Sequence, residues 1–337
     1  MKRPIARNRF PKSMAVLTGV LLAGALALSA CTSGNSSSPS SASSGTASGS
    51  ASGGLVGFLA SDATHNPFAV SLAKGTLNEA SKLGLQLSYV DAKNDLTKQI
   101  AAIQSFMSRG AKVIVVFPAD PTSLVPVLNQ AASQGIKIVV LNQPLEPSAK
   151  ILTYVGADNY AYGQAEGKLL AQSLNGKGTF ALAEGIAATQ AAQDRTKGIE
   201  DTLKQYPNIH MVASQSDNWD PQQALSLAQD WQGKYPTLSA IVYEGPEGTV
   251  AGQWAKAHGR ANLKVILGDY PKAVQDAIEA GTVYGTVNQD PVQQGVLAMQ
   301  VAQKVLKGQD SQIPQPILKT PLPLITASNA AADPASW

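Results

Sequence analysis

The chain has 337 residues, with 26 Lys and Arg against 23 Asp and Glu and a formal net charge of +3. Five of the basic residues fall within the first 12 positions, so the rest carries 21 basic against 23 acidic residues and lacks the basic excess of nucleic-acid-binding domains. The single cysteine, Cys31, excludes an internal disulfide, so core packing has to stabilise the fold.

Residues 1–30 have the pattern of a secretory signal peptide. A basic start precedes the apolar stretch 14–28, which is shorter than the ~20 residues of a membrane-spanning helix. The stretch leads into LSAC at 28–31, which resembles the bacterial lipobox, where a cysteine is lipidated after cleavage. The alternative is an ordinary cleavage site with a cysteine present by chance. We expect a lipidated Cys31 that holds an extracytoplasmic protein on the outer face of a bacterial cell membrane.

The segment that follows predicts a flexible tether. Residues 32–54 consist of Ser, Gly, Ala and Thr with one Asn and one Pro. Such a segment cannot bury enough apolar surface to offset the entropy lost on ordering. Together with the lipidated cysteine, residues 31–54 are expected to form a Ser/Gly linker with a root-mean-square span of roughly 26 Å.

From residue 55 onward, strand-like and helix-like patterns alternate. The run 113–117 is apolar without alternation, which is typical of a strand buried on both faces of a parallel sheet. The first half predicts strands at 55–60, 85–90, 113–117 and 137–141, with helices near 67–83, 95–109 and 122–134.

The pattern restarts after residue 155. It predicts strands at 179–183, 209–214, 239–243, 264–267 and 282–287, helices near 159–174, 190–204, 221–232, 247–258, 271–280 and 291–306, and a last strand around 317–326. This alternation predicts the α/β class, with two doubly wound lobes whose parallel sheets have helices on both faces. Ligands of such sheets bind outside the carboxyl ends of the strands, so the loops after strands are the places to look for function.

Those loops carry hydrogen-bonding groups and aromatic rings. The candidate site residues are Ser61, Asn66, Phe68, Asn142, Gln143, Arg195, Trp219, Asp269 and Gln289. Carboxylates, guanidinium and amides suit hydroxyls, which both donate and accept, and aromatic rings pack on the C–H faces of sugars. Each residue alone has a plainer interpretation, such as a helix cap for Asn66 before Pro67. Together they predict a site for a small polar solute, with no metal, cofactor or catalytic residue.

The chain resembles the periplasmic ribose/galactose-type sugar-binding proteins of ABC transporters, the type I solute-binding family. The resemblance spans about residues 55–326. It rests on the order and spacing of HNPF at 65–68, GIAATQAAQDR at 185–195, ASQSDNWD at 213–220, ILGDYP at 266–271 and VNQDP at 287–291.

The resemblance implies a type I periplasmic binding protein whose two lobes are joined by a three-strand hinge. It divides the chain into lobe 1 at 55–157 and 290–318, lobe 2 at 158–289 and 319–327, and a C-terminal tail at 328–337. It further implies a monomer that closes around a monosaccharide or polyol and delivers it to the transmembrane subunits of an ABC permease. The same fold also serves as a co-receptor for a membrane sensor kinase or chemoreceptor, and the sequence leaves this alternative open.

The resemblance also implies roles for individual residues. Asn66 would hydrogen-bond the solute, and Phe68 would stack on it. Arg195 and Asp269 would bind hydroxyls or the ring oxygen from the second lobe. Trp219 would take the place of an aromatic pocket residue, and Gln289 that of a hinge-side amide.

Three positions depart from the family pattern. Many sugar binders carry an Asp-Arg pair where this chain has Asn142-Gln143, and often an Asn where it has Gly245. Phe117 stands where ribose binders have Asn. The implied solute is therefore open among another pentose or hexose, a sugar alcohol, a cyclitol and other polar metabolites.

Other functional classes lack support in the sequence. The three histidines, His65, His210 and His258, share no motif, and the chain has no nucleophile elbow, P-loop or dinucleotide-binding glycine motif. We therefore expect a protein that is not an enzyme. A sugar-responsive repressor would need an N-terminal helix-turn-helix where this chain has the predicted signal peptide and tether.

Overall fold

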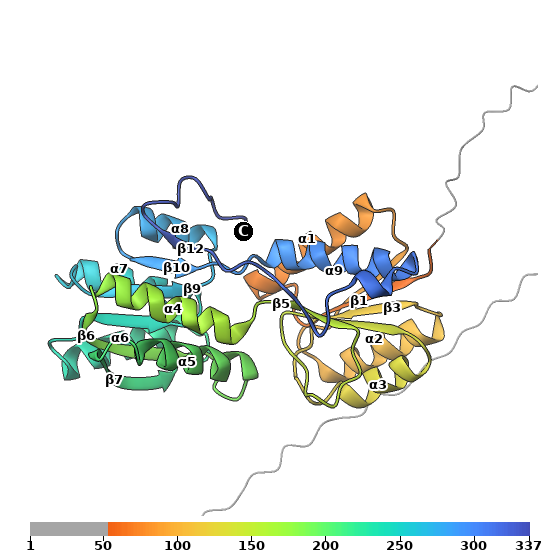
Figure 1. The fold of residues 1–337 in the computed structure, drawn as a ribbon, viewed down its shortest axis with the longest axis horizontal. Coiled ribbons are helices and arrows are strands. Elements are labelled where there is room, and N and C mark those ends of the chain that lie inside the picture. The colour runs from red at the N-terminus through yellow and green to blue at the C-terminus, as the bar shows by residue number, and fades with distance from the viewer. Residues whose placement is uncertain (1–52) are drawn as a thin grey trace, which may run out of the picture. The chain divides into compact units, whose positions relative to one another are not determined.

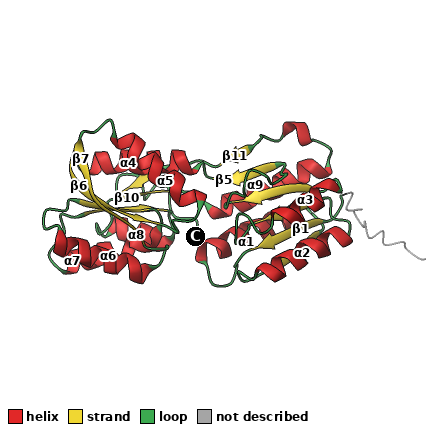
Figure 2. Cartoon of the chain, turned by 90° about the horizontal axis from the view of Figure 1, so that it is seen from below, coloured by secondary structure: helices red, strands yellow, loops and turns green. Residues whose placement is uncertain are grey.

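The computed structural model describes residues 53–337, which form two six-stranded sheets with helices on both faces of each (Figures 1 and 2). The predicted signal peptide, Cys31 and all but the last two residues of the predicted linker lie outside the described residues. The predicted fold class, two doubly wound parallel-sheet lobes, is confirmed. Within residues 53–337 no helix combines the length and the apolar character that a bilayer crossing requires.

The first sheet is entirely parallel and has the order β11-β5-β4-β3-β1-β2. Its strands are β1 (Val56–Ala60), β2 (Leu87–Asp91), β3 (Val113–Val116), β4 (Lys137–Leu141), β5 (Thr153–Gly156) and β11 (Ile317–Lys319). Helices α1 (Pro67–Lys82) and α9 (Pro291–Leu306) pack on one face, and α2 (Leu96–Ser108) and α3 (Val125–Ser133) pack on the other. The central strands β1 and β3 are buried along their whole length, as the apolar run at 113–117 predicts.

The second sheet has the order β12-β10-β9-β8-β6-β7, and only β12 runs antiparallel to its neighbour. Its strands are β6 (Lys177–Glu184), β7 (Asn208–Ser216), β8 (Ala240–Tyr243), β9 (Lys264–Gly268), β10 (Gly285–Val287) and β12 (Leu324–Thr326). One face packs against α4 (Asn159–Ser173) and α5 (Gln190–Leu203), the other against α6 (Pro221–Lys234), α7 (Thr249–Ala257) and α8 (Lys272–Glu279). Two short 3₁₀ helices complete the fold, η1 (Pro246–Gly248) and η2 (Asp310–Gln312).

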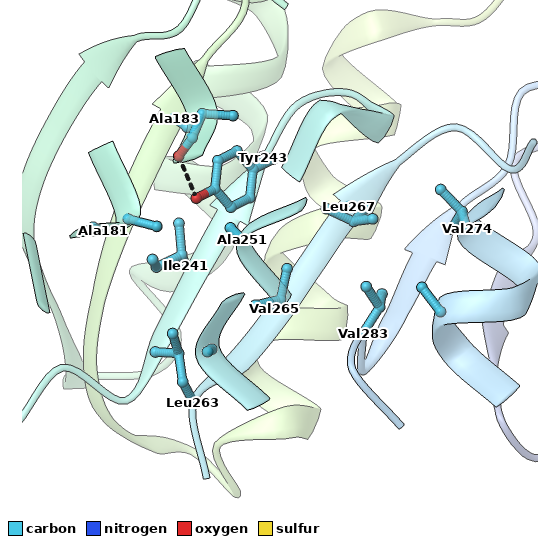
Figure 3. Close-up of a cluster of buried hydrophobic side chains, with 14 of the residues drawn as sticks. Ala181, Ala183, Ile241, Tyr243, Ala251, Leu263, Val265, Leu267, Val274 and Val283 are labelled. Carbon is cyan, nitrogen blue, oxygen red and sulfur yellow. Dashed lines mark hydrogen bonds between the residues drawn. The ribbon is translucent and has the colours of Figure 1, made fainter. Parts of the chain in front are cut away.

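Strand β8 illustrates why these strands are apolar without alternation. Ile241 and Tyr243 pack toward α6, α7 and α8 (Figure 3), whereas Ala240 and Val242 pack toward α4 and α5. Successive side chains of a strand point to opposite faces, and both faces of this sheet are covered. The two helical layers therefore hold the carboxyl end of β8 in a fixed position.

Within the described residues the chain passes between the sheets three times, after β5, after β10 and between β11 and β12. The prediction of a single strand over 317–326 is wrong, because two short strands in different sheets occupy that range. Pro321 and Pro323 lie between them and have no N–H to donate to a ladder. Strand β5, the four residues before the first passage, is absent from the predicted elements.

Candidate functional site

A cavity of about 930 Å³ lies where the carboxyl ends of strands from both sheets meet. This volume falls within the ~300–1,000 Å³ of small-molecule sites. Eight of the nine sequence-predicted site residues line it: Asn66, Phe68, Asn142, Gln143, Arg195, Trp219, Asp269 and Gln289. The ninth, Ser61, is buried outside the lining, and its carbonyl oxygen accepts a hydrogen bond from the Asn94 N–H at 2.6 Å.

The first lobe presents Asn66 and Phe68 at the start of helix α1. Asn66 is the N-cap, and its Oδ1 accepts hydrogen bonds from the N–H groups of Phe68 at 2.9 Å and Ala69 at 3.2 Å. Pro67 follows at the first helical position, where its missing N–H costs nothing. Capping thus occupies the Asn66 side-chain oxygen, which leaves its Nδ2 group as the donor for a solute.

A cluster of three amides lies where the chain passes between the lobes. Asn142 has a positive φ of 58° and donates from Nδ2 to Oε1 of Gln294 at 3.1 Å and of Gln289 at 3.4 Å. Gln294 in turn donates to Gln289 at 3.3 Å. Gln294 is fully buried on α9 and was not predicted, because no sequence motif distinguishes it from other helical glutamines. The cluster therefore adds hydrogen-bonding groups without charge at the point where the chain passes between the lobes.

Close packing of helices α4 and α5 fixes the position of Arg195. A methyl group at Gly163 would lie 1.9 Å from the carbonyl oxygen of Arg195, and one at Gly198 would lie 2.3 Å from that of Tyr160. Only glycine allows the two helix backbones to approach this closely. The approach brings Arg195 to the cavity from a fully packed layer.

The guanidinium of Arg195 is held from several sides. Nε donates to Oδ1 of Asn159 at 3.0 Å, and Nη1 donates to the carbonyl oxygen of Glu244. Its central carbon lies 3.9 Å from the centre of the Tyr162 ring, a cation–π contact. These contacts orient the planar group of a residue that lines the cavity.

Asp269 follows strand β9 with a positive φ of 61°. Its Oδ1 accepts a hydrogen bond from the Tyr162 hydroxyl at 3.1 Å, and its N–H donates to the carbonyl oxygen of Val287 at 2.9 Å. Burial raises the pKa of Asp269, while the Arg195 charge and the hydrogen bonds of Gln289 and Tyr162 act in the opposite direction. A buried acceptor and a buried donor, Asp269 and Arg195, thus line the same cavity from the second lobe.

Trp219 follows strand β7 through an unusual turn. Asn218 and Trp219 both have positive φ angles, 55° and 53°, and the Trp219 N–H donates to Oδ1 of Asp217 at 2.9 Å. The indole lies on Gly185, where a methyl group would come within 2.1 Å of Cε2. Backbone strain of this kind concentrates at functional sites. The turn places the ring in the cavity wall rather than in the core.

Two buried carboxyl groups adjoin this turn. Burial raises the pKa of Asp217 to about 6 and that of Glu247 well above its usual range, and each group perturbs the other. Burial thus disfavours the charged form of both groups. Glu247 also lines the cavity, so this wall carries less negative charge than its composition suggests.

Glu244 supports the site from behind. Its Oε2 accepts a hydrogen bond from the Gly185 N–H at 2.9 Å, and its Oε1 accepts one from the Thr196 hydroxyl at 2.9 Å. Burial raises the pKa of Glu244 to about 7. Through these bonds Glu244 connects the loop beneath Trp219 to the helix that carries Arg195.

Among the lining residues that the sequence did not suggest is Trp337 in the C-terminal segment. Its ring meets Phe68 edge to face, with 5.5 Å between ring centres. The position of Trp337 in the sequence gave no signal, because the residue does not come directly after a strand but lies 11 residues beyond the end of β12.

Comparison with known proteins supplies family context. A sequence model of the periplasmic binding protein domain matches residues 56–310. The ribose import binding protein of Salmonella typhimurium is 27% identical over 260 residues, which cover 77% of this chain and 87% of that protein. The xylitol-binding protein of Mycolicibacterium smegmatis is 28% identical over 228 residues, which cover 67% of this chain and 65% of that protein. A solved ABC transporter solute-binding protein from Mycobacterium smegmatis with bound glycerol is 30% identical, with a TM-score of 0.73 and coverage of 83% of this chain and 96% of that chain.

Proposed function

Because the chain belongs to the periplasmic binding protein domain family, we propose that it is the substrate-binding lipoprotein of an ABC importer and captures a sugar or sugar-like polyol between its two lobes. Members of this family are extracytoplasmic binding proteins rather than enzymes. This chain binds its solute without converting it. The match to an import protein supports uptake over the sensing alternative.

The observation that carries the proposal is the convergence of donors, acceptors and rings from separate segments on one cavity. Arg195 supplies a cation and Asp269 an anion, so the two offset each other and suit an uncharged solute. Asn66, Asn142, Gln143 and Gln289 add neutral amides. A site that pairs its buried groups with hydroxyls rejects analogues without them, because those groups would be left unpaired.

The solute class follows from the chemistry of the lining. Phe68, Phe117 and Trp219 offer apolar ring surface for C–H groups, and the polar residues offer partners for hydroxyls. The compared proteins are a ribose binder, a xylitol binder and a protein with bound glycerol, which supports a polyhydroxylated ligand. A pentose, a hexose, a sugar alcohol or a cyclitol fits this description.

Residues 1–54 would supply the anchor. Lipidation at Cys31 would hold the protein on the outer face of the membrane, and the Ser/Gly linker would let the lobes reach the permease. Both lobes contribute to the cavity, so a bound solute favours the arrangement in which the lobes are closest. The permease subunits would recognise that closed surface.

A thermal-shift screen tests the function. The mature protein is heated with D-ribose, other pentoses, hexoses, xylitol, glycerol, cyclitols, amino acids and short peptides, and calorimetry measures affinity for each hit. A solute present at 100 times its Kd stabilises the fold by about 2.7 kcal/mol, which raises the melting temperature. The proposal predicts hits confined to sugars and polyols. Hits confined to amino acids or peptides would overturn it.

A further inference from the structure

The C-terminal segment after β12 runs along the second lobe and ends at the cavity. In Figure 1 this dark blue segment passes over α8 before it reaches the mark of the C-terminus. Ala330 is buried in the core of the second lobe, and Tyr270 donates to its carbonyl oxygen at 3.5 Å. The Ala335 N–H donates to Oε1 of Gln275 on α8 at 3.0 Å. The segment is therefore anchored to the second lobe over its length.

Trp337 itself connects the two lobes. Its backbone oxygen accepts a hydrogen bond from the Lys272 N–H at 2.6 Å, at the start of α8. Its ring meets Phe68 of α1, in the first lobe, edge to face. Both aromatic residues line the cavity. The contact places two rings, one from each lobe, in the same wall.

One polar atom of Trp337 is not accounted for by packing. Its Nε1 is buried, yet no acceptor among residues 53–337 lies within hydrogen-bonding distance. A buried donor without a partner costs free energy, and native structures rarely leave one. Trp337 lines the cavity, so a solute hydroxyl would become the acceptor once the wall adjusts around the solute and exposes the N–H.

We propose that Trp337 is a specificity-determining residue of the solute site, whose Nε1–H donates to a hydroxyl of the bound sugar or polyol while its ring and Phe68 cover an apolar face of the same molecule. This inference rests on the proposed function. The backbone of Trp337 is hydrogen-bonded to the second lobe, and its side chain contacts Phe68 in the first lobe. The wall that it forms with Phe68 is therefore complete only when both lobes are in place.

The test separates the N–H donor from the ring. Trp337→Phe keeps an aromatic ring and removes the donor, and Trp337→Ala removes both. Trp254→Phe is the matched control, because Trp254 stacks on His258 on α7 and does not line the cavity. Calorimetric titrations use D-ribose, 2-deoxy-D-ribose, xylitol and glycerol with the wild type and each variant.

For the hydroxylated probe that binds best, Trp337→Phe should weaken binding ~2- to 10-fold, the loss expected for one neutral hydrogen bond. Trp337→Ala should weaken it further, and Trp254→Phe should leave it unchanged. The ratio between the affinity for the fully hydroxylated probe and the affinity for a probe that lacks one hydroxyl should also be smaller in Trp337→Phe than in the wild type. A role confined to packing would lower affinity for all probes by one factor.

The outcomes distinguish two kinds of failure. If Trp337→Phe and Trp337→Ala bind every probe as the wild type does, while Asp269→Asn loses binding, then the assignment of Trp337 is wrong and the proposed function stands. An equal loss for all probes in Trp337→Phe also overturns the assignment. If the wild type binds no sugar or polyol, the proposed function fails and the inference falls with it.

Discussion

Trp219 occupies the space beside Gly245 that a side chain at that position would need. A methyl group on Gly245 would lie 2.9 Å from Cδ1 of Trp219 and 2.4 Å from Oε2 of Glu247. The family resemblance implies an asparagine in many sugar binders where this chain has Gly245. Here the glycine has a physical reason, because it lets the indole lie close to the end of β8.

Replacing Gly245 should reshape this wall. We expect Gly245→Ala to displace the Trp219 ring and to weaken solute binding by ~10-fold or more, a cost of about 1.4 kcal/mol that lies within the range for overpacking. Titration calorimetry measures the affinity. Gly233→Ala is the matched control, because a methyl group there meets no atom within 4 Å. Equal affinities for the two variants would contradict the account of Trp219.

Asp269→Asn tests the buried acceptor. The substitution keeps the size of the side chain and suits a residue with positive φ, but it removes the negative charge. We expect binding of the best hydroxylated probe to weaken by about 2 kcal/mol, or ~30-fold, as for a lost charged hydrogen bond. Asp230→Asn, at an exposed position on α6, should have no effect. Unchanged affinity in Asp269→Asn would exclude this carboxylate from the contacts with solute.

Glu244 should make the fold less stable as pH rises. Its folded-state pKa of about 7 lies above the ordinary 4.5, so the folded protein binds more protons than the unfolded chain between these values. The contribution is complete below pH ~4.5 and is lost as pH rises through ~7, by about 3 kcal/mol at most. Chemical denaturation from pH 4.5 to 8 measures it.

Glu244→Gln provides the control for this pH dependence. The amide retains an acceptor for the Gly185 N–H and a donor for the Thr196 hydroxyl, but it does not titrate. The difference in unfolding free energy between wild type and variant should therefore change across this pH window. A constant difference would show that Glu244 does not carry the effect, even if Asp217 gives the wild type some pH dependence.

Cys31→Ala tests the proposed anchor. Without the thiol no lipid can be attached, so we expect the protein to move from the membrane fraction to the soluble fraction. Detergent phase partitioning of wild type and variant measures the change. Solute affinity should stay the same, because the residues that line the cavity all fall between positions 62 and 337. A variant that still partitions into detergent would contradict the anchor.

Most strands and helices of both lobes follow from hydrophobic periodicity alone. Strand β5 was missed because its sequence, TYVG, lacks the continuous apolar run that marks the equally short strands β3 and β8. The range 317–326 was predicted as one strand although Pro321 and Pro323 indicate a break. In both cases pairing with a distant strand, rather than local pattern, decides the structure.

The site residues show the same contrast between positions that the local sequence predicts and positions that depend on distant contacts. Eight residues of the cavity wall could be located because the carboxyl ends of parallel strands determine where loops gather. Ser61 sits in such a loop, yet its carbonyl bonds to Asn94 and the residue is buried outside the lining. Gln294 and Trp337 depend on how α9 and the C-terminal segment dock, which no strand end indicates. The strand ends of the site could therefore be predicted, whereas the contributions of α9 and the C-terminal segment depend on tertiary contacts that the sequence does not indicate.

The passages between the sheets determine when each lobe can finish folding. Strand β11 closes the edge of the first sheet, and α9 covers its face against α1, although both come after the whole central part of the second lobe. With residues 53–156 alone, the first sheet has α1 on one face but lacks α9 beside it and β11 at its edge. Contacts between segments this far apart slow folding. Neither lobe is therefore complete until the end of the chain is available, because β12 and the C-terminal segment complete the second lobe after β11 has completed the first. Until α9 has docked, the apolar surface that it covers in the first lobe stays open.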